Sequence, residues 1–210
     1  MITINNNMYV LDTDNTSYAF AVLGSGQLEH LYYGRKLHAN EAVMTEKHTF
    51  IPGNTNVYNK DYSSYSLEDV CLEMSSLGKG DIREPFIEVT YPNGSSTTDM
   101  VFDRAEIIQG KEEYDTLPGS YDDNGEVEQL VIYLKDRNYN LTLELHYYVY
   151  EKCDIITRSA KLVNSGNESV RLERLMSMQL DLNESDYELS FFNGAWACLL
   201  YTSDAADDLT

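Results

Sequence analysis

The stretch "LTLELHYYVY", residues 141–150, decides the fold class because its apolar and polar residues alternate. Successive side chains of a β-strand point to opposite faces, so residues two positions apart share a face. One face of this stretch is entirely apolar, and it consists of Leu141, Leu143, Leu145, Tyr147 and Val149. The stretch therefore predicts a strand with one face in a hydrophobic core, and it places His146 on the opposite face.

Similar strand patterns fill most of the chain, separated by turns rich in Gly and Asn. The segments that predict strands are 17–34, with a hairpin around Gly24–Gly26, then 86–108, with a turn at Pro92–Gly94, then 126–134, 153–163 and 170–182. No segment has the 3.6-residue period and caps of a helix. We therefore expect one all-β domain over residues 1–197, an antiparallel sandwich, with a long loop at 38–69.

The composition supports a packed domain and narrows the choice of partner. Hydrophobic residues make up 42% of the 210 residues, enough for a sizeable core, and the 17 tyrosines suit a half-buried pleated surface. The formal net charge is −20, which repels phosphate backbones and anionic lipid. We therefore expect no nucleic-acid and no membrane partner, whereas neutral ligands such as sugars are compatible with this charge.

The cysteines and the N-terminus indicate a reducing compartment. Cys71, Cys153 and Cys198 are few, odd in number and without C-x-x-C spacing, so neither a disulfide framework nor a zinc site is expected. Residues 1–15 lack the basic and apolar regions of a signal peptide, and no apolar run of about 18 residues could span a bilayer. The expectation is a cytoplasmic protein without cofactor or metal.

The segment "GKGDIREP", residues 78–85, is a first candidate site, and its notable residues are Gly78, Asp81, Arg83 and Pro85. Asp81 and Arg83 flank one residue, so on an extended segment their side chains point the same way. They could form an ion pair within a turn, or they could share a ligand. The sequence pattern alone favours the ion pair.

Trp196 is the only tryptophan, and its flat apolar ring with one N–H donor suits stacking on a sugar. A core anchor at the end of a strand explains it equally well. His30, His38 and His48 lack the spacing of a metal site, and the acidic residues 122–128 lack the spacing of a calcium-binding loop. Many carboxylates are present, but none is singled out as an acid/base pair.

Four separated motifs together resemble one known family. They are "NTSYAFAVLGSGQLEHLYYG" (15–34), "GKGDIREP" (78–85), "DIITRSAKLVNSG" (154–166) and "GAWA" (194–197), and they occur in the same order as in the N-terminal region of glycoside hydrolase family 36 α-galactosidases. The resemblance runs from about Thr13 to Ala197. It implies a β-supersandwich that precedes a catalytic (β/α)8 barrel in a homo-oligomeric enzyme. The implied reaction is the retaining hydrolysis of terminal α-galactosides such as melibiose and raffinose by two aspartates of that barrel.

The resemblance also suggests roles for particular residues. It places Trp196 at the rim of the galactose site, and it places Gly78, Asp81, Arg83 and Pro85 near a domain or subunit contact. The segment "TEKHTFIPGN", residues 45–54, matches a loop that reaches a neighbouring active site with an acidic residue, a position taken here by Glu46 or Lys47. No catalytic residue is expected in this chain, because the barrel alone takes about 250 residues.

The strand pattern ends at Trp196 and the resemblance ends at Ala197. Residues 198–210 resemble translated sequencing-adapter sequence, so we expect a non-family tail on an enzyme fragment that is inactive alone. Unpaired strands would then expose apolar surface around Phe191, Phe192 and Trp196. The alternative is a free-standing β-sandwich that binds carbohydrate or mediates assembly. A structural role, in which the domain covers the barrel and joins subunits, is compatible with the enzyme fragment.

Overall fold

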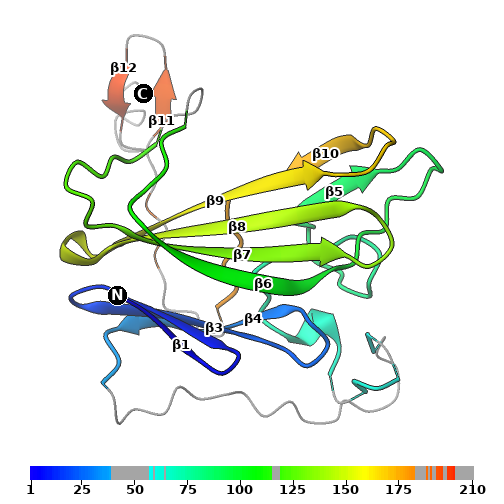
Figure 1. Cartoon of the computed structure of the whole chain (residues 1–210), viewed down its shortest axis with the longest axis horizontal. Coiled ribbons are helices and arrows are strands. Elements are labelled where there is room, and N and C mark those ends of the chain that lie inside the picture. Colours follow the sequence, from blue (N-terminus) through cyan, green and yellow to red (C-terminus); the bar gives the residue numbers. More distant parts are fainter. Residues whose placement is uncertain are drawn as a thin grey trace, which may run out of the picture.

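The computed structural model describes residues 1–38, 57–58, 60–63, 65–114 and 119–182, residues 188 and 190, and the backbone of 193–195 and 198–201. Two antiparallel four-stranded sheets form the body of the protein (Figure 1). The first has the order β1 (Ile2–Asn5), β2 (Met8–Asp12), β3 (Thr16–Val22), β4 (Leu28–Arg35). The second has the order β6 (Met100–Gln109), β7 (Glu128–Asp136), β8 (Leu141–Tyr150), β9 (Ile155–Asn164).

Two smaller antiparallel pairs complete the described strands. They are β5 (Ile87–Thr90) with β10 (Arg171–Leu175), and β11 (Asn193–Ala195) with β12 (Cys198–Tyr201). The only helical elements in the described part of the chain are two short 3-10 turns, η1 (Leu67–Asp69) and η2 (Glu151–Cys153). The predicted all-β antiparallel fold is confirmed. The alternation of the sequence did not predict a strand at Cys198–Tyr201.

The predicted face of residues 141–150 is confirmed in β8. Its five apolar residues are all at most 2% exposed, and Leu145 lies between Ile132 of β7 and Ala160 of β9. A strand paired on both sides can reach the core only through one set of alternate side chains, which explains why the pattern is cleanest here.

The opposite face of β8 is also covered, which alternation alone does not predict. His146 and Tyr148 point away from the leucines but are buried. The segment after β6 lies over them, and the hydroxyl of Tyr114 hydrogen-bonds the Tyr148 hydroxyl and the Ser159 hydroxyl, both at 2.6 Å. A tyrosine-rich strand can therefore bury both of its faces.

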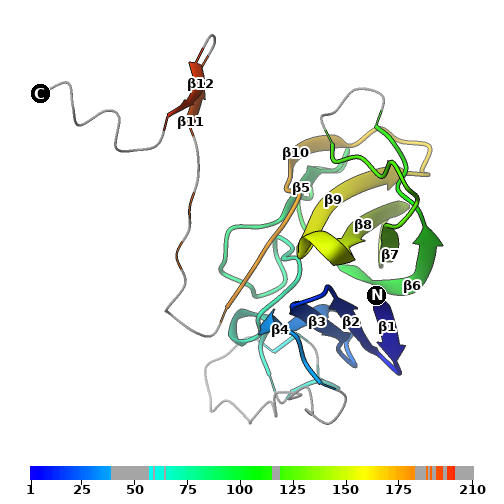
Figure 2. The same cartoon turned by 90° about the vertical axis from the view of Figure 1, so that its left-hand side faces the viewer.

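Aromatic rings join the two large sheets, which face each other in Figure 2. The Phe20 ring of β3 stacks on Tyr9 of β2 and on Tyr147 of β8, with 5.1 Å between the ring centroids in each case. These rings and the leucines of β7 and β8 belong to one hydrophobic cluster. The sheets therefore pack as a sandwich around an aromatic core.

The alternating run 170–182 forms a strand only in its first part. β10 ends at Leu175, one residue before the Met176 amide donates to the Phe86 carbonyl at 3.0 Å. Residues 176–182 continue outside the sheets, and Met178 is exposed. The strand predicted to end at Leu182 was thus too long, because no described strand pairs with it beyond β5.

No helix in the described part of the chain is long and apolar enough to cross a membrane.

Candidate functional site

The buried glutamate Glu73 lies where the two large sheets meet. Its side chain is completely inaccessible to solvent. Four polar side chains surround it, two from each sheet: Tyr18 of β3, His30 of β4, Tyr147 of β8 and Arg158 of β9. We call these five residues the Glu73 cluster.

Each carboxylate oxygen of Glu73 has two polar partners. Oε1 accepts hydrogen bonds from the Tyr18 hydroxyl and from His30 Nδ1, the latter at 3.1 Å. Oε2 accepts a hydrogen bond from the Tyr147 hydroxyl at 2.7 Å and lies 2.9 Å from Arg158 Nη2. Because an ionised carboxylate can only accept, His30 Nδ1 carries a proton.

The electrostatics of the cluster keep Glu73 ionised. Burial by itself raises the pKa of this carboxyl, but Arg158, His30 and Tyr18 together hold the pKa below its ordinary value. Burial and the Glu73 charge raise the pKa of both Tyr18 and Tyr147 well above the usual range, so both hydroxyls stay protonated and donate. A carboxylate with all its acceptor positions filled is suited to hold two sheets together and not to transfer protons.

Arg158 extends the cluster to the segment after β10. Its Nη1 donates to the Tyr18 hydroxyl at 3.0 Å and to the Gln179 carbonyl at 2.9 Å. Desolvation acts to lower the pKa of Arg158, but Tyr147 and Glu73 raise it above its ordinary value. The guanidinium therefore stays charged and anchors residue 179 to the interior.

The second arginine anchor is Arg83, which forms the predicted ion pair with Asp81. Its Nε and Nη2 donate to the two Asp81 oxygens at 2.9 and 3.0 Å, a bidentate geometry. Nη1 donates to the Val70 carbonyl at 2.7 Å and to the Asp181 carboxylate, and Nη2 donates to the Leu67 carbonyl at 2.6 Å. Internal acceptors thus occupy the guanidinium, so a shared ligand on this pair is disfavoured.

The other residues of "GKGDIREP" shape the same loop. Gly78 has φ +87°, and a Cβ there would lie 2.5 Å from the Thr97 hydroxyl oxygen, so glycine is required. Pro85 is buried and lies two residues before β5 begins at Ile87. The side chains of Asp81 and Arg83 are engaged inward, and Ile82 between them is 85% exposed. The loop is a fixed support that presents one apolar side chain to solvent.

Sequence reasoning missed Glu73 and Arg158. A lone glutamate in "CLEMSS" carries no local signal. Arg158 did carry one, because it occupies the same face of β9 as Ile156, Ala160 and Leu162, which pack on the core. A charged residue at an inward position of a strand indicates a buried partner of opposite charge.

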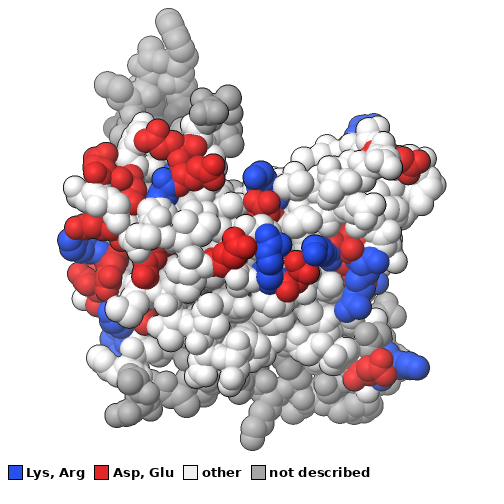
Figure 3. Space-filling view, in the orientation of Figure 1, with Lys and Arg blue, Asp and Glu red and all other residues white. Residues whose placement is uncertain are grey.

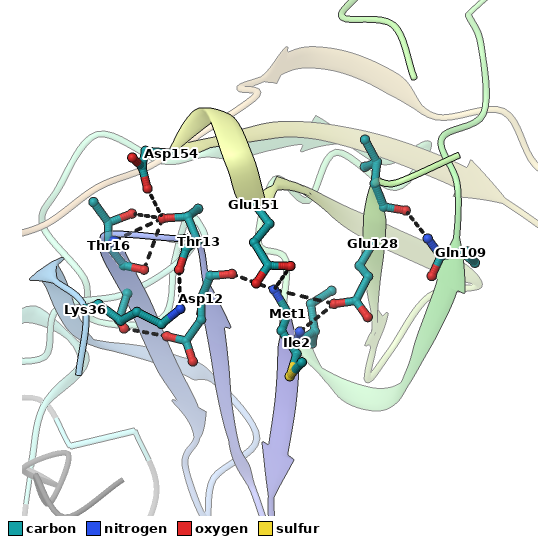
Figure 4. A network of polar contacts seen from close by, with 12 residues as sticks. Met1, Ile2, Asp12, Thr13, Thr16, Lys36, Gln109, Glu128, Glu151 and Asp154 are labelled. Atoms are coloured by element: carbon teal, nitrogen blue, oxygen red, sulfur yellow. Dashed lines mark hydrogen bonds and ion pairs between the residues drawn. The ribbon is translucent and has the colours of Figure 1, made fainter. Parts of the chain in front are cut away.

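The acidic residues 122–128 are used in structural contacts. The Asp122 carboxylate accepts the backbone N–H of Glu126 at 2.9 Å, and Glu126 pairs with Lys152 at 2.8 Å. Glu128 accepts the Ile2 N–H at 2.7 Å and so links the two sheets at this end (Figure 4). Among the described residues no group of three or more His, Cys, Asp or Glu could hold a metal ion.

Several residues that the sequence analysis singled out lie outside the described part of the chain. These are Trp196, Phe191, Phe192, His48, Glu46 and Lys47. His38 is described and exposed, and it belongs to no metal cluster.

Comparison with known proteins decides the family. The model of the "Glycosyl hydrolase family 36 N-terminal domain" matches residues 26–198, most of the chain. The chain belongs to glycosyl hydrolase family 36. It is 34% identical over 192 residues to α-galactosidase AgaA of Geobacillus stearothermophilus, covering 89% of this chain and 26% of AgaA. It is 32% identical to the bifunctional α-galactosidase/sucrose kinase AgaSK of Mediterraneibacter gnavus, covering 92% of this chain and 21% of AgaSK.

Solved structures of family 36 enzymes have the same fold as this chain. The α-galactosidase AgaB of Geobacillus stearothermophilus superposes with a TM-score of 0.82 at 29% identity, over 89% of this chain and 26% of AgaB. The α-galactosidase of Lactobacillus brevis gives the same TM-score at 33% identity, over 94% of this chain and 28% of that one. The family 36 N-terminal β-supersandwich predicted from the motifs is therefore confirmed. The chain spans about a quarter of the length of these relatives.

Removing the charge of Glu73 should destabilise the domain strongly. In Glu73→Gln the Arg158 charge remains buried without its counter-charge, which costs about 3–5 kcal/mol of unfolding free energy. Urea denaturation at neutral pH measures this loss. The control is Glu126→Gln, whose side chain is 54% exposed and pairs with Lys152, and it should cost less than about 1 kcal/mol. Equal losses in both variants would contradict the structural role of the Glu73 cluster.

The same cluster predicts acid sensitivity. The folded pKa of Glu73 is lower than its unfolded pKa, so its stabilisation is complete above the unfolded value of about 4.3 and is lost as the pH falls through the folded value. The difference in unfolding free energy between the wild type and Glu73→Gln should therefore shrink below about pH 4. Urea titrations between neutral pH and pH 3 measure it. A difference that stays constant over this range would contradict the assignment of an ionised Glu73.

Proposed function

We propose that this chain is the N-terminal domain portion of a retaining α-galactosidase, and that the catalytic aspartates of that enzyme belong to a region outside this chain. The observation that carries the proposal is the family match over residues 26–198. Solved structures of AgaA variants from Geobacillus stearothermophilus contain raffinose or stachyose. By this relationship the substrates are oligosaccharides that end in an α-galactoside. Glu73 is the most buried carboxylate among the described residues, and both of its oxygens already have partners within the protein. This supports a catalytic site outside this chain.

Within that enzyme we assign Trp196 to the rim of the galactose site. An indole ring stacks on the apolar face of a sugar and adds one N–H donor. The segment 176–182 that leads towards Trp196 is held at residues 179 and 181 by Arg158 and Arg83. Each of these arginines is in turn fixed by an inner carboxylate, Glu73 or Asp81.

We assign the loop of Gly78, Asp81, Arg83 and Pro85 to a domain or subunit contact of a homo-oligomeric enzyme. The exposure of Ile82 on this braced loop supports the assignment, because a fixed apolar side chain binds a partner without loss of loop entropy. We also propose a cytoplasmic location, on the basis of the sparse and odd set of cysteines.

A chimeric enzyme tests the role of Trp196. Residues 1–197 joined to the catalytic region of AgaA should hydrolyse an α-galactoside, whereas the 210-residue chain alone should not. In this chimera Trp196→Ala should raise KM about tenfold, corresponding to about 1.5 kcal/mol of lost stacking, with a smaller effect on kcat. Tyr121→Ala is the matched control, because Tyr121 is 75% exposed at the acidic end of the domain. Hydrolysis by the 210-residue chain alone would overturn the proposal.

The contact role of Ile82 is tested in the same chimera. Ile82→Asp should dissociate the assembly or loosen the domain contact, because it places a charge against an apolar partner surface. Light scattering gives the oligomeric mass, and thermal melting reports on the domain contact. Ile108→Asp is the control, since Ile108 is an exposed residue near the end of β6. Unchanged mass and unchanged melting temperature for Ile82→Asp would exclude this loop from any contact.

A further inference from the structure

Three turns meet at one end of the sandwich and enclose a pocket. They follow β5, β7 and β9, and all three lie at the right-hand end of Figure 1. The pocket has a volume of about 240 Å³. We call it the turn pocket, and it is lined by Tyr91, Pro92, residues 138–141, Asn164, residues 166–168 and Val170.

The turn pocket offers unused amide groups. The side chains of Asn138, Asn140 and Asn167 line it and are exposed. In the part of the chain that the structure describes, the carboxamide atoms of these three residues make no hydrogen bond within the protein. Each carboxamide has two N–H donors and one carbonyl acceptor, so the three together suit a ligand that carries several hydroxyl groups.

One wall of the turn pocket is an aromatic platform. The ring of Tyr139 stacks on the ring of Tyr91, with 3.5 Å between centroids and 12° between planes. The Tyr139 hydroxyl accepts a hydrogen bond from Asn93 Nδ2 at 3.1 Å. A fixed tyrosine ring can pack against the C–H face of a pyranose.

Hydrogen bonds within the protein brace the turns. Asp136 Oδ1 accepts the backbone N–H groups of Asn138 and Tyr139 at 2.8 and 3.0 Å. Asn164 accepts the Gly166 N–H at 2.9 Å and donates to the Glu168 carbonyl at 2.9 Å. Little ordering entropy is therefore lost when a ligand binds, which favours recognition by few contacts.

Charge and size narrow the ligand class. Among the described residues that line the turn pocket, Glu168 is the only charged one, although the protein has a net charge of −20. The volume is below the range of about 300–1,000 Å³ that is typical of drug-sized ligands, so it suits one sugar ring. We propose that the turn pocket binds a single neutral pyranose ring as a non-catalytic site. The inference goes beyond the proposed function, because it requires no catalytic region.

Amide chemical shifts of the ¹⁵N-labelled 210-residue chain test this proposal. Galactose, melibiose and glucose serve as separate probes, so that preference between epimers is also measured. We expect saturable shifts concentrated at residues 138–141 and 164–168. The expected Kd is on the order of millimolar, because a monosaccharide has about twelve non-hydrogen atoms and each contributes only modestly to the binding free energy. Calorimetry on the same chain gives a second measurement of the Kd.

Two variants and one control locate the binding. Asn140→Ala and Asn167→Ala should each weaken binding several-fold without lowering the melting temperature, because neither side chain is hydrogen-bonded within the described protein. Asn124→Ala, an exposed asparagine at the acidic end, should bind as the wild type does. The proposal is overturned if no sugar gives saturable shifts, or if both pocket variants bind as tightly as the control. Either result leaves the chimera experiment unaffected, so the two proposals fail separately.

Discussion

The buried carboxylate of Glu73 is the interaction on which the sandwich depends. Moving a carboxylate out of water costs several kcal/mol, and only a complete set of partners offsets this cost. Tyr18 and His30 come from one sheet, and Tyr147 and Arg158 from the other, so the set is complete only when both sheets are in register. The cluster therefore contributes more to the uniqueness of the packing than a purely apolar contact of the same size would.

The two arginine anchors extend this internal order to the surface. Arg158 links Glu73 to residue 179, and Arg83 links Asp81 and the 67–70 segment to residue 181. Residues 176–182 have no strand partner in the described structure, yet they are held at two points two residues apart. The path of the chain beyond β10 thus depends on charges fixed in the interior, and not on sheet hydrogen bonds.

The two ends of the domain differ, with an acidic surface at one end and a largely uncharged pocket at the other. Carboxylates gather over the left-hand end of the domain in Figure 3. Asp122, Asp123, Glu126 and Glu151 line one pocket at the acidic end. Asparagine and tyrosine line the turn pocket at the other end. Carboxylates keep the protein soluble through their charge, whereas amides and aromatic rings recognise neutral hydroxylated ligands, so the two ends are suited to different tasks.

The sequence by itself determined the fold class, the central strand, the family and the Asp81–Arg83 pair, because strand alternation and D-x-R spacing are local properties that any extended segment expresses. Only the tertiary structure decided where Glu73 finds its partners, that Tyr148 is buried on the outer face, and that β10 ends at Leu175. Each of these depends on segments far apart in the chain. The physical reason is that the burial of a side chain and the pairing of a strand depend on segments that are distant in sequence and adjacent in the fold. A local sequence pattern does not specify those segments.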